Sequence, residues 1–248
     1  MPPFNWRAYG SAAILILAGT AFAARPMNPW ILRVSMPNKV RINLITLSST
    51  LSVAYDAPNA ALYEAWSGTY INGTDSYNYS KGILACSYMP QGKILYKQAP
   101  GGAVSETPGT RVVSSTTSPT NETPVTVWTS TLNAAAVAVK PEYKGYTVNN
   151  TAETMNMRFR LTAGSAVVDV TEAPEVATGG LQRDFTFKGI PTGMVISLLL
   201  TGNTINKSGG TVTETWTATG TGKVETRDGK RYLVQDKDGD TRLIGTWN

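Results

Sequence analysis

The chain has 248 residues, of which 42% are hydrophobic and 16% charged, and its formal net charge is +5. This length suits one large β domain or two small ones. The chain has no histidine and one cysteine, Cys86. Histidine-containing catalytic triads, histidine-ligated metals or haem, thiolate clusters and an internal disulfide are thereby excluded. The basic residues are scattered, so we do not expect nucleic-acid binding. With no histidine and one cysteine, we also expect no cofactor.

Residues 1–24 have the features of a secretory signal. Arg7 precedes an apolar stretch, and Ala21, Phe22 and Ala23 form an A-x-A cleavage pattern. The apolar residues 8–24 are also just long enough to span a bilayer, so an uncleaved membrane anchor helix is the alternative. Both interpretations place the remainder in the periplasm or on the extracellular face of a bacterial membrane.

Residues 25–97 form the front part of the predicted β domain. The stretch "RINLITLSSTLSVAYD" predicts the first strands, and "APN" after it predicts a turn. Only "NAALYEAW" resembles a short helix. The apolar run "GILACSYMP" predicts a strand in which Cys86 is buried. Four aromatic residues of this part are candidates for a sugar-stacking surface: Tyr63, Trp66, Tyr70 and Tyr77. Aromatic rings also fill β cores, so packing inside the domain is the alternative.

Residues 98–124 are rich in serine, threonine, proline and glycine. Such a stretch inside a domain indicates either an exposed loop or an arm that becomes ordered on a partner. It separates the front part from the back part, residues 125–248.

The back part alternates apolar and polar residues in several stretches. In "TMNMRFRL" the apolar residues fall at every second position, and "LQRDFTFKG" repeats this pattern. The continuous apolar run "MVISLLL" is typical of a central strand. Glycine-containing turns recur between these stretches. The whole pattern predicts an all-β fold, an antiparallel β-sandwich of the Greek-key kind.

Two acidic motifs are candidates for chemistry. Asp236, Asp238 and Asp240 alternate in "QDKDGDTR", where carboxylates can converge on calcium. An Asp-Gly hairpin turn between two strands explains the same motif without a metal. In "VTEAPEVATGG", Glu172 and Glu175 are candidates for acid–base hydrolysis. Their spacing around a proline instead predicts an exposed acidic loop.

A longer signature lies in "LSVAYDAPNAALYEAWSGTYINGTDSYN", preceded by "PWILR" and "KVRINLITL". With "MRFRLTAGSAVVDVTEAPEV" and "LQRDFTFKGIPTGMVISLLL", it resembles a module of large secreted proteins of environmental bacteria that often also carry a c-type cytochrome domain. The resemblance covers most of residues 29–200 except the arm. It implies an extracytoplasmic β domain without catalytic residues to transfer. The chain has no C-x-x-C-H haem site, so we expect no electron transfer by this chain itself.

The sequence therefore favours a non-enzymatic accessory or structural subunit. Such a subunit would bind and stabilise a bacterial membrane protein complex, for example an electron-transfer or photosynthetic one, with residues 8–24 in the membrane if uncleaved. A secreted carbohydrate-binding module with a glycan ligand is the first alternative. A hydrolase that depends on Asp and Glu alone is the second.

Overall fold

The structure is a computed structural model that describes residues 29–36, 39–68, 70–71, 89–90, 92–98, 104–107 and 126–248. All secondary structure in these residues is strand, and every pairing is antiparallel except the short one between β8 and β16. The all-β prediction is therefore confirmed for the described part of the chain. That part contains no helix long and apolar enough to cross a membrane. The expected signal or anchor at residues 1–24 lies outside the described residues, as does Cys86.

The first sheet, sheet I, comes from the front part of the chain. Its strands, in spatial order, are β1 (Trp30–Met36), β2 (Lys39–Thr46), β3 (Leu51–Asp56), β4 (Ala61–Ser67) and β7 (Ile94–Lys97). The turn predicted at "APN" is confirmed, and it joins β3 to β4 as an antiparallel hairpin. In its turn Asn59 donates a hydrogen bond from Nδ2 to Oδ2 of Asp56 at 2.8 Å, and the N–H of Ala60 donates to the carbonyl of Ala57 at 3.2 Å. "NAALYEAW" is therefore turn and strand and not helix.

The back part of the chain forms two larger sheets. Sheet II contains, in spatial order, β10 (Ala135–Val137), β9 (Trp128–Leu132), β15 (Met194–Leu199), β20 (Lys230–Gln235) and β19 (Lys223–Arg227). Sheet III contains β11 (Val139–Asn149), β12 (Thr154–Ala163), β13 (Ala166–Ala177), β14 (Gly180–Lys188), β21 (Gly239–Trp247) and β18 (Glu214–Gly220). The run "MVISLLL" is thus the central strand of sheet II, as predicted.

Two smaller sheets complete the described structure. One contains β17 (Gly210–Thr211), β16 (Ile205–Lys207) and β8 (Val104–Ser105), and the other contains β5 (Tyr70–Ile71) and β6 (Met89–Pro90).

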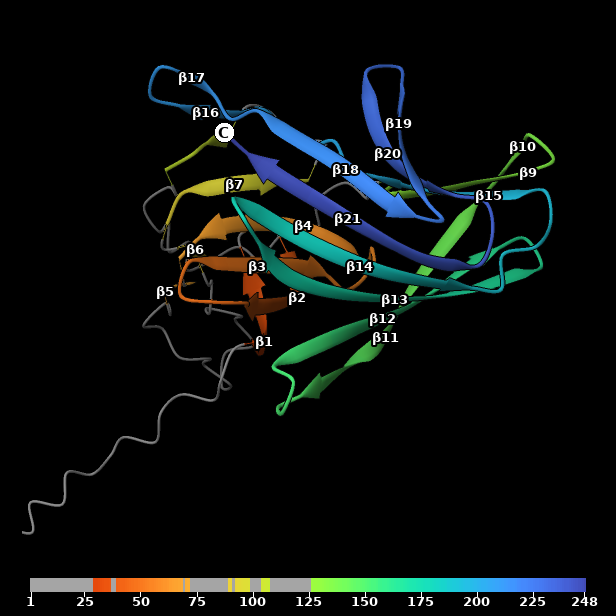
Figure 1. The fold of residues 1–248 in the computed structure, drawn as a ribbon, viewed down its shortest axis with the longest axis horizontal. Coiled ribbons are helices and arrows are strands. Elements are labelled where there is room, and N and C mark those ends of the chain that lie inside the picture. Colours follow the sequence, from red (N-terminus) through yellow and green to blue (C-terminus); the bar gives the residue numbers. More distant parts are fainter. Residues whose placement is uncertain are drawn as a thin grey trace, which may run out of the picture.

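The expected Greek-key sandwich is wrong, because the chain does not form a single pair of stacked sheets. Sheet I lies toward one end of the molecule and sheet II toward the other, and the long strands of sheet III run between them (Figure 1). With the three-stranded sheet, four sheets are set around the core, an arrangement nearer to a four-bladed β-propeller than to a sandwich. The alternation of residues predicts strands correctly, but it does not say which strands share a sheet.

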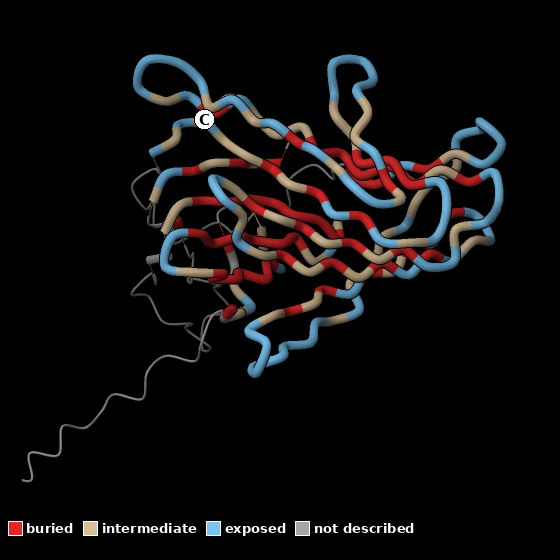
Figure 2. Tube along the Cα trace, in the orientation of Figure 1, coloured by how far each residue is buried: buried red, intermediate tan, exposed pale blue. Residues whose placement is uncertain are grey.

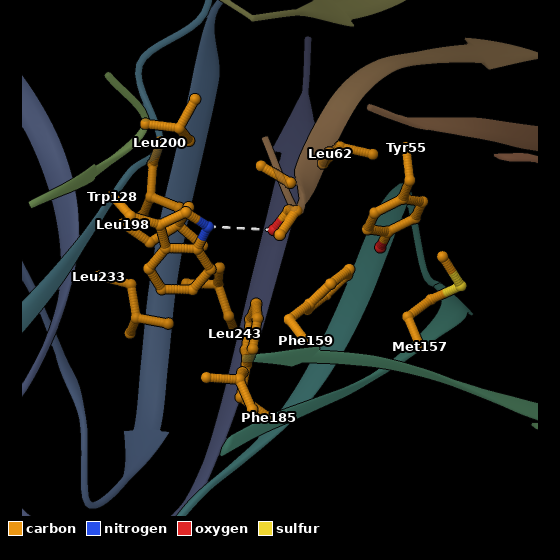
Figure 3. Close-up of a cluster of buried hydrophobic side chains, with 14 of the residues drawn as sticks. Tyr55, Leu62, Trp128, Met157, Phe159, Phe185, Leu198, Leu200, Leu233 and Leu243 are labelled. Carbon is orange, nitrogen blue, oxygen red and sulfur yellow. Dashed lines mark hydrogen bonds between the residues drawn. The ribbon is translucent and has the colours of Figure 1, made fainter. Parts of the chain in front are cut away.

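One continuous core is shared by sheets I, II and III. Each sheet places apolar side chains at alternate positions, as β12 does with Met155, Met157 and Phe159. Tyr55 of sheet I stacks against Phe159 with ring centroids 6.4 Å apart, and the indole N–H of Trp128 in sheet II donates to the carbonyl of Ala60 at 3.0 Å (Figure 3). Burying each such large side chain contributes roughly 1.5–3 kcal/mol, so this core is the main source of stability.

Sheet I is buried on both faces. Its second face carries a separate apolar cluster of Met36, Ile42, Leu44, Ala54, Tyr63 and Trp66. For this reason β3 is buried at every position, as Figure 2 shows by the continuous red of the inner strands. A strand of this kind reads as a mostly apolar run rather than as an alternation.

A short part of the predicted arm connects the two halves of the chain. The N–H of Glu106 donates to the carbonyl of Asn206 at 2.7 Å, and the carbonyl of Glu106 accepts from the N–H of Ile94 in β7 at 2.8 Å. The N–H of Val104 donates to the carbonyl of Thr204 at 2.9 Å. Residues 104–107 therefore lie between sheet I and β16, and the remainder of the predicted arm lies outside the described residues.

Candidate functional site

A polar group of three side chains lies inside the core between sheets I and III. Tyr55 comes from β3, Glu172 from β13 and Arg183 from β14, and all three are buried. Arg183 donates from Nε to Oε1 of Glu172 at 2.6 Å and from Nη2 to Oε2 at 3.1 Å. The hydroxyl of Tyr55 donates to the same Oε1. We call these residues the buried triad.

The alternation of β13 and β14 explains why these charges are inside. Glu172 follows Val168 and Val170 at every second position of β13, and Arg183 lies between Leu181 and Phe185 in β14. All of these positions face the core. The predicted exposed acidic loop is therefore wrong for Glu172, since the segment is a strand and this carboxylate is 0% exposed.

The electrostatics of the buried triad keep Tyr55 neutral and Arg183 charged. Burial raises the pKa of the Tyr55 hydroxyl and the Glu172 carboxylate raises it further, so the phenol stays a neutral donor. Burial lowers the pKa of Arg183, but Glu172, Tyr55 and Tyr96 together outweigh this effect and the net shift of the pKa is upward. The Glu172 carboxylate is thus held between a neutral and a cationic donor. Such a closed set of hydrogen bonds satisfies a buried charge and specifies how two sheets pack.

A second polar group joins β18 to β20. Arg231 donates from Nη2 to Oε1 of Glu214 at 2.6 Å and from Nη1 to the carbonyl of the same residue at 2.6 Å. The ring of Tyr96 in sheet I meets Trp216 edge-on, with centroids 5.8 Å apart. Burial raises the pKa of Tyr96 strongly, and Glu214 raises it further. This group links all three larger sheets. Its two charged residues, Glu214 and Arg231, pair with each other.

The outer face of sheet III has a hollow of about 450 Å³. Its lining residues belong to β14, β18, β21 and their ends: Asp184, Phe185, Thr186, Thr219, Gly220, Asp240, Thr241 and Arg242. Asp184 accepts two hydrogen bonds from Arg242 at 2.9 Å, and Thr186 donates to Asp240 at 2.6 Å. The two carboxylates of the hollow therefore already have partners, so it does not offer a free acid–base pair.

The three aspartates proposed for calcium are not brought together. Asp238 accepts the backbone N–H of Ile190 at 2.7 Å, and hydrogen bonds from Gly189 and Ile190 lower its pKa. Asp240 bonds to Thr186 instead. In the part of the chain that the structure describes, no three carboxylate, histidine or cysteine side chains are placed to hold a metal ion. The calcium interpretation of Asp236, Asp238 and Asp240 is thus not supported.

The hairpin-turn interpretation of the same motif is also wrong. β20 and β21 flank these aspartates, but β20 pairs with β15 and β19 whereas β21 pairs with β14 and β18. The motif therefore makes a corner between sheets II and III. The true Asp-Gly hairpin turn is Asp228-Gly229, between the paired residues Arg227 and Lys230.

The aromatic residues proposed for glycan binding do not form an exposed row. Tyr63 is 3% exposed and Trp66 is 0% exposed, both in the second cluster of sheet I. The ammonium groups of Lys39 and Lys97 lie 5.3 and 5.4 Å from the ring centroid of Tyr63. A glycan-stacking surface needs exposed rings, so these two residues do not supply one. The side chain of Tyr70 and the whole of Tyr77 lie outside the described residues.

The comparisons with known proteins add no relative. The chain matches no protein-family model. No curated protein is significantly similar to it in sequence. The resemblance to a module of secreted bacterial proteins therefore stays a prediction.

Sequence reasoning missed the buried triad, although a signal for it is present. Arg183 occupies an inward position of "LQRDFTFKG", and Glu172 occupies an inward position of the adjacent strand. Opposite charges at core-facing positions of two consecutive strands indicate a buried ion pair, because lone charges are not left inside a core. The proline in "TEAPEV" favoured the loop interpretation instead. Proline has no backbone N–H to donate to a neighbouring strand. Pro174 is tolerated because the pairing of β12 with β13 ends at Glu172, so no such bond to β12 is needed there.

Proposed function

We propose that the protein is a non-enzymatic structural subunit that works outside the cytoplasm and stabilises a bacterial membrane protein complex. The observation that carries this proposal is that the buried carboxylates are paired with cations of the protein itself. Three carboxylates are buried among the described residues, and each contacts a cation of the fold: Asp56 with Lys39 at 2.9 Å, Glu64 with Lys97 at 3.6 Å and Glu172 with Arg183 at 2.6 Å.

This pairing supports a structural role in preference to acid–base chemistry. A catalytic carboxylate needs access to substrate and a pKa suited to proton transfer. A carboxylate held by a guanidinium inside a core instead fixes the relative position of two strands. The hydrolase alternative would need two carboxylates that face one cleft without internal partners, and the hollow on sheet III does not provide them. Tyr63 and Trp66 are buried and so cannot stack on a sugar, which argues against the glycan alternative.

Location outside the cytoplasm rests on residues 1–24 of the sequence. Both interpretations of that segment, cleaved signal and retained anchor, export the β domain. The low charged fraction of 16% is consistent with an exported β protein, since soluble domains average about 25%.

The test is to isolate the native protein from detergent-solubilised membranes and determine its mass and its partners. We expect the full chain to elute in a stable complex and to form cross-links with the same membrane proteins in independent preparations. A chain found alone in the soluble periplasmic or culture fraction would overturn the proposal. A matched preparation washed with high salt before solubilisation separates stable subunits from proteins adsorbed by charge.

A further inference from the structure

β11 is the edge strand of sheet III. Its residues Val139–Asn149 pair with β12 on one side only. On the other side, none of the described backbone hydrogen bonds outside the strand ladders reaches residues 140–149. The far end of the β11–β12 hairpin projects from the molecule, where the tube is largely pale blue (Figure 2). An edge of this kind exposes free N–H and C=O groups to which another strand can bond.

The two halves of β11 differ in how this edge is protected. The first half carries Lys140, Pro141 and Lys144, and its register shifts between Tyr143 and Gly145. Charged residues, proline and bulges are the usual devices that prevent an edge from pairing. The protection therefore covers the strand as far as Lys144.

The second half of β11 has none of these devices. Residues Tyr146–Asn149 are uncharged and pair with β12 in unbroken register. Tyr146 is 36% exposed and Val148 is 38% exposed, although both lie on the face of the sheet that elsewhere is buried. We call residues 146–149 the open edge.

Other edge strands of the larger sheets are different. β19 places Lys223, Glu225 and Arg227 at alternate positions, and these side chains form ion pairs with one another. β18, at the other side of sheet III, exposes threonines. The combination of a free edge and exposed apolar side chains thus distinguishes β11 from β18 and β19.

Two guanidinium groups lie next to Tyr143 and Gly145, just before the open edge. Arg33 of β1 and Arg158 of β12 are exposed and form no ion pair among the described residues. Both act electrostatically on Tyr143, and Arg33 also lies within hydrogen-bonding reach of its hydroxyl. The Arg158 side chain also lies beside Gly145. Cations that form no ion pair among the described residues suit a carboxylate, because it would make charge-assisted hydrogen bonds with them.

We propose that the open edge of β11 accepts an added β-strand from a partner protein, a segment that alternates apolar residues with Asp or Glu. The apolar side chains of that segment pack on Tyr146 and Val148, and its carboxylates meet Arg33 and Arg158. Backbone hydrogen bonds then supply affinity and the alternate side chains supply specificity, as in other cases of strand addition. This inference names the docking surface of the proposed subunit and so rests on the proposed function.

The direct test uses a fluorescein-labelled peptide in which three valines alternate with aspartates, titrated into the full chain and followed by anisotropy. We expect saturable binding that weakens at least tenfold in the double variant Tyr146→Lys, Val148→Lys. The charge-reversed variant Arg158→Glu is expected to weaken it by a similar factor. The matched control is Val176→Lys, a valine that is 47% exposed on β13, a strand that does not pair with β11; we expect this variant to bind as the wild type does.

Three results would overturn the inference. One is a peptide that does not bind the wild-type chain. Another is a peptide that binds the double variant and the Val176→Lys control equally, since the site would then lie elsewhere. The third is a concentration-dependent dimer in sedimentation that the double variant abolishes, because the occupant would then be a second copy of this chain. Far-ultraviolet circular dichroism of each variant checks that the fold is retained.

The proposed function and this inference fail separately. If the protein co-purifies with membrane proteins but the double variant remains in the complex, the subunit role stands and the docking surface is wrong. If the peptide binds as expected but the native chain is found alone and soluble, the edge is a strand-binding site and the subunit role is wrong.

Discussion

The hydroxyl of Tyr55 in β3 and the carboxylate of Glu172 in β13 are joined by a hydrogen bond across the core, although β3 belongs to sheet I and β13 to sheet III. The same carboxylate oxygen accepts the Nε–H of Arg183. One buried acid therefore links the front part of the chain to the back part. The contact specifies position as well as adding stability, because a carboxylate between two donors tolerates little displacement.

Tyr55→Phe removes this link with little change in shape. We expect the free energy of unfolding to fall by about 1–3 kcal/mol, since a buried charged acceptor loses one of its donors. Urea denaturation followed by tryptophan fluorescence measures the change. Tyr143→Phe is the matched control, because it removes a hydroxyl whose charged neighbours are Arg33 and Arg158 and not a buried acid. Equal effects of the two substitutions would show that the link across the core contributes nothing.

Arg183→Met leaves the Glu172 charge buried without its cation. We expect a loss of about 3–5 kcal/mol, the usual cost of breaking a buried ion pair from one side. The double variant Glu172→Gln, Arg183→Met should be more stable than Arg183→Met alone, since no charge then remains inside. A double-mutant cycle from urea unfolding gives the coupling energy directly. A double variant less stable than both single variants would contradict this account.

Stability should fall at alkaline pH because of Tyr55 and Tyr96. Burial raises the pKa of both hydroxyls above the ordinary value of about 10. The folded state therefore favours the neutral phenol. This contribution is fully present below pH 10 and is lost as the pH rises toward the folded-state pKa, since the unfolded chain releases its protons first.

The measurement is the free energy of unfolding in urea between pH 8 and about pH 11. Tyr96→Phe should flatten the decline, because one group no longer titrates differently in the two states. Tyr232→Phe, a half-buried tyrosine whose ring lies 5.8 Å from the Arg227 guanidinium, serves as the comparison. If the free energy of unfolding of Tyr96→Phe declined with pH as steeply as that of the wild type, burial of the Tyr96 phenol would not be the cause of the alkaline loss of stability.

Gly245→Ala should destabilise β21 by overpacking. A Cβ atom at this position would lie 2.4 Å from Cζ3 of Trp216, which is itself buried against Trp247. We expect a loss of about 1–3 kcal/mol and a changed tryptophan emission spectrum. In Gly229→Ala the new methyl group meets open space, so only the strain of a positive φ of 72° is added. The melting temperatures of the two variants should therefore differ, with Gly245→Ala the lower.

Much of the local structure follows from the sequence for physical reasons that act over a few residues. Met155, Met157 and Phe159 alternate with polar residues, and this predicts β12 and its buried face. Tyr55 and Leu62 flank a Pro-Asn turn, and this predicts the β3–β4 hairpin. Alternation and turn chemistry are properties of neighbouring residues, so they can be recognised without knowing the partner strands.

The sequence by itself thus determined the all-β class, strands such as β12, β14 and β15, and the turn of the main hairpin. Only the tertiary structure decided that Glu172 is inside with Arg183, that Tyr63 and Trp66 are buried, and that the aspartates near Gly239 turn a corner between sheets. These properties depend on which strands become neighbours. That choice is made by packing and charge complementarity between segments far apart in the chain, and it leaves no regular pattern in either segment alone.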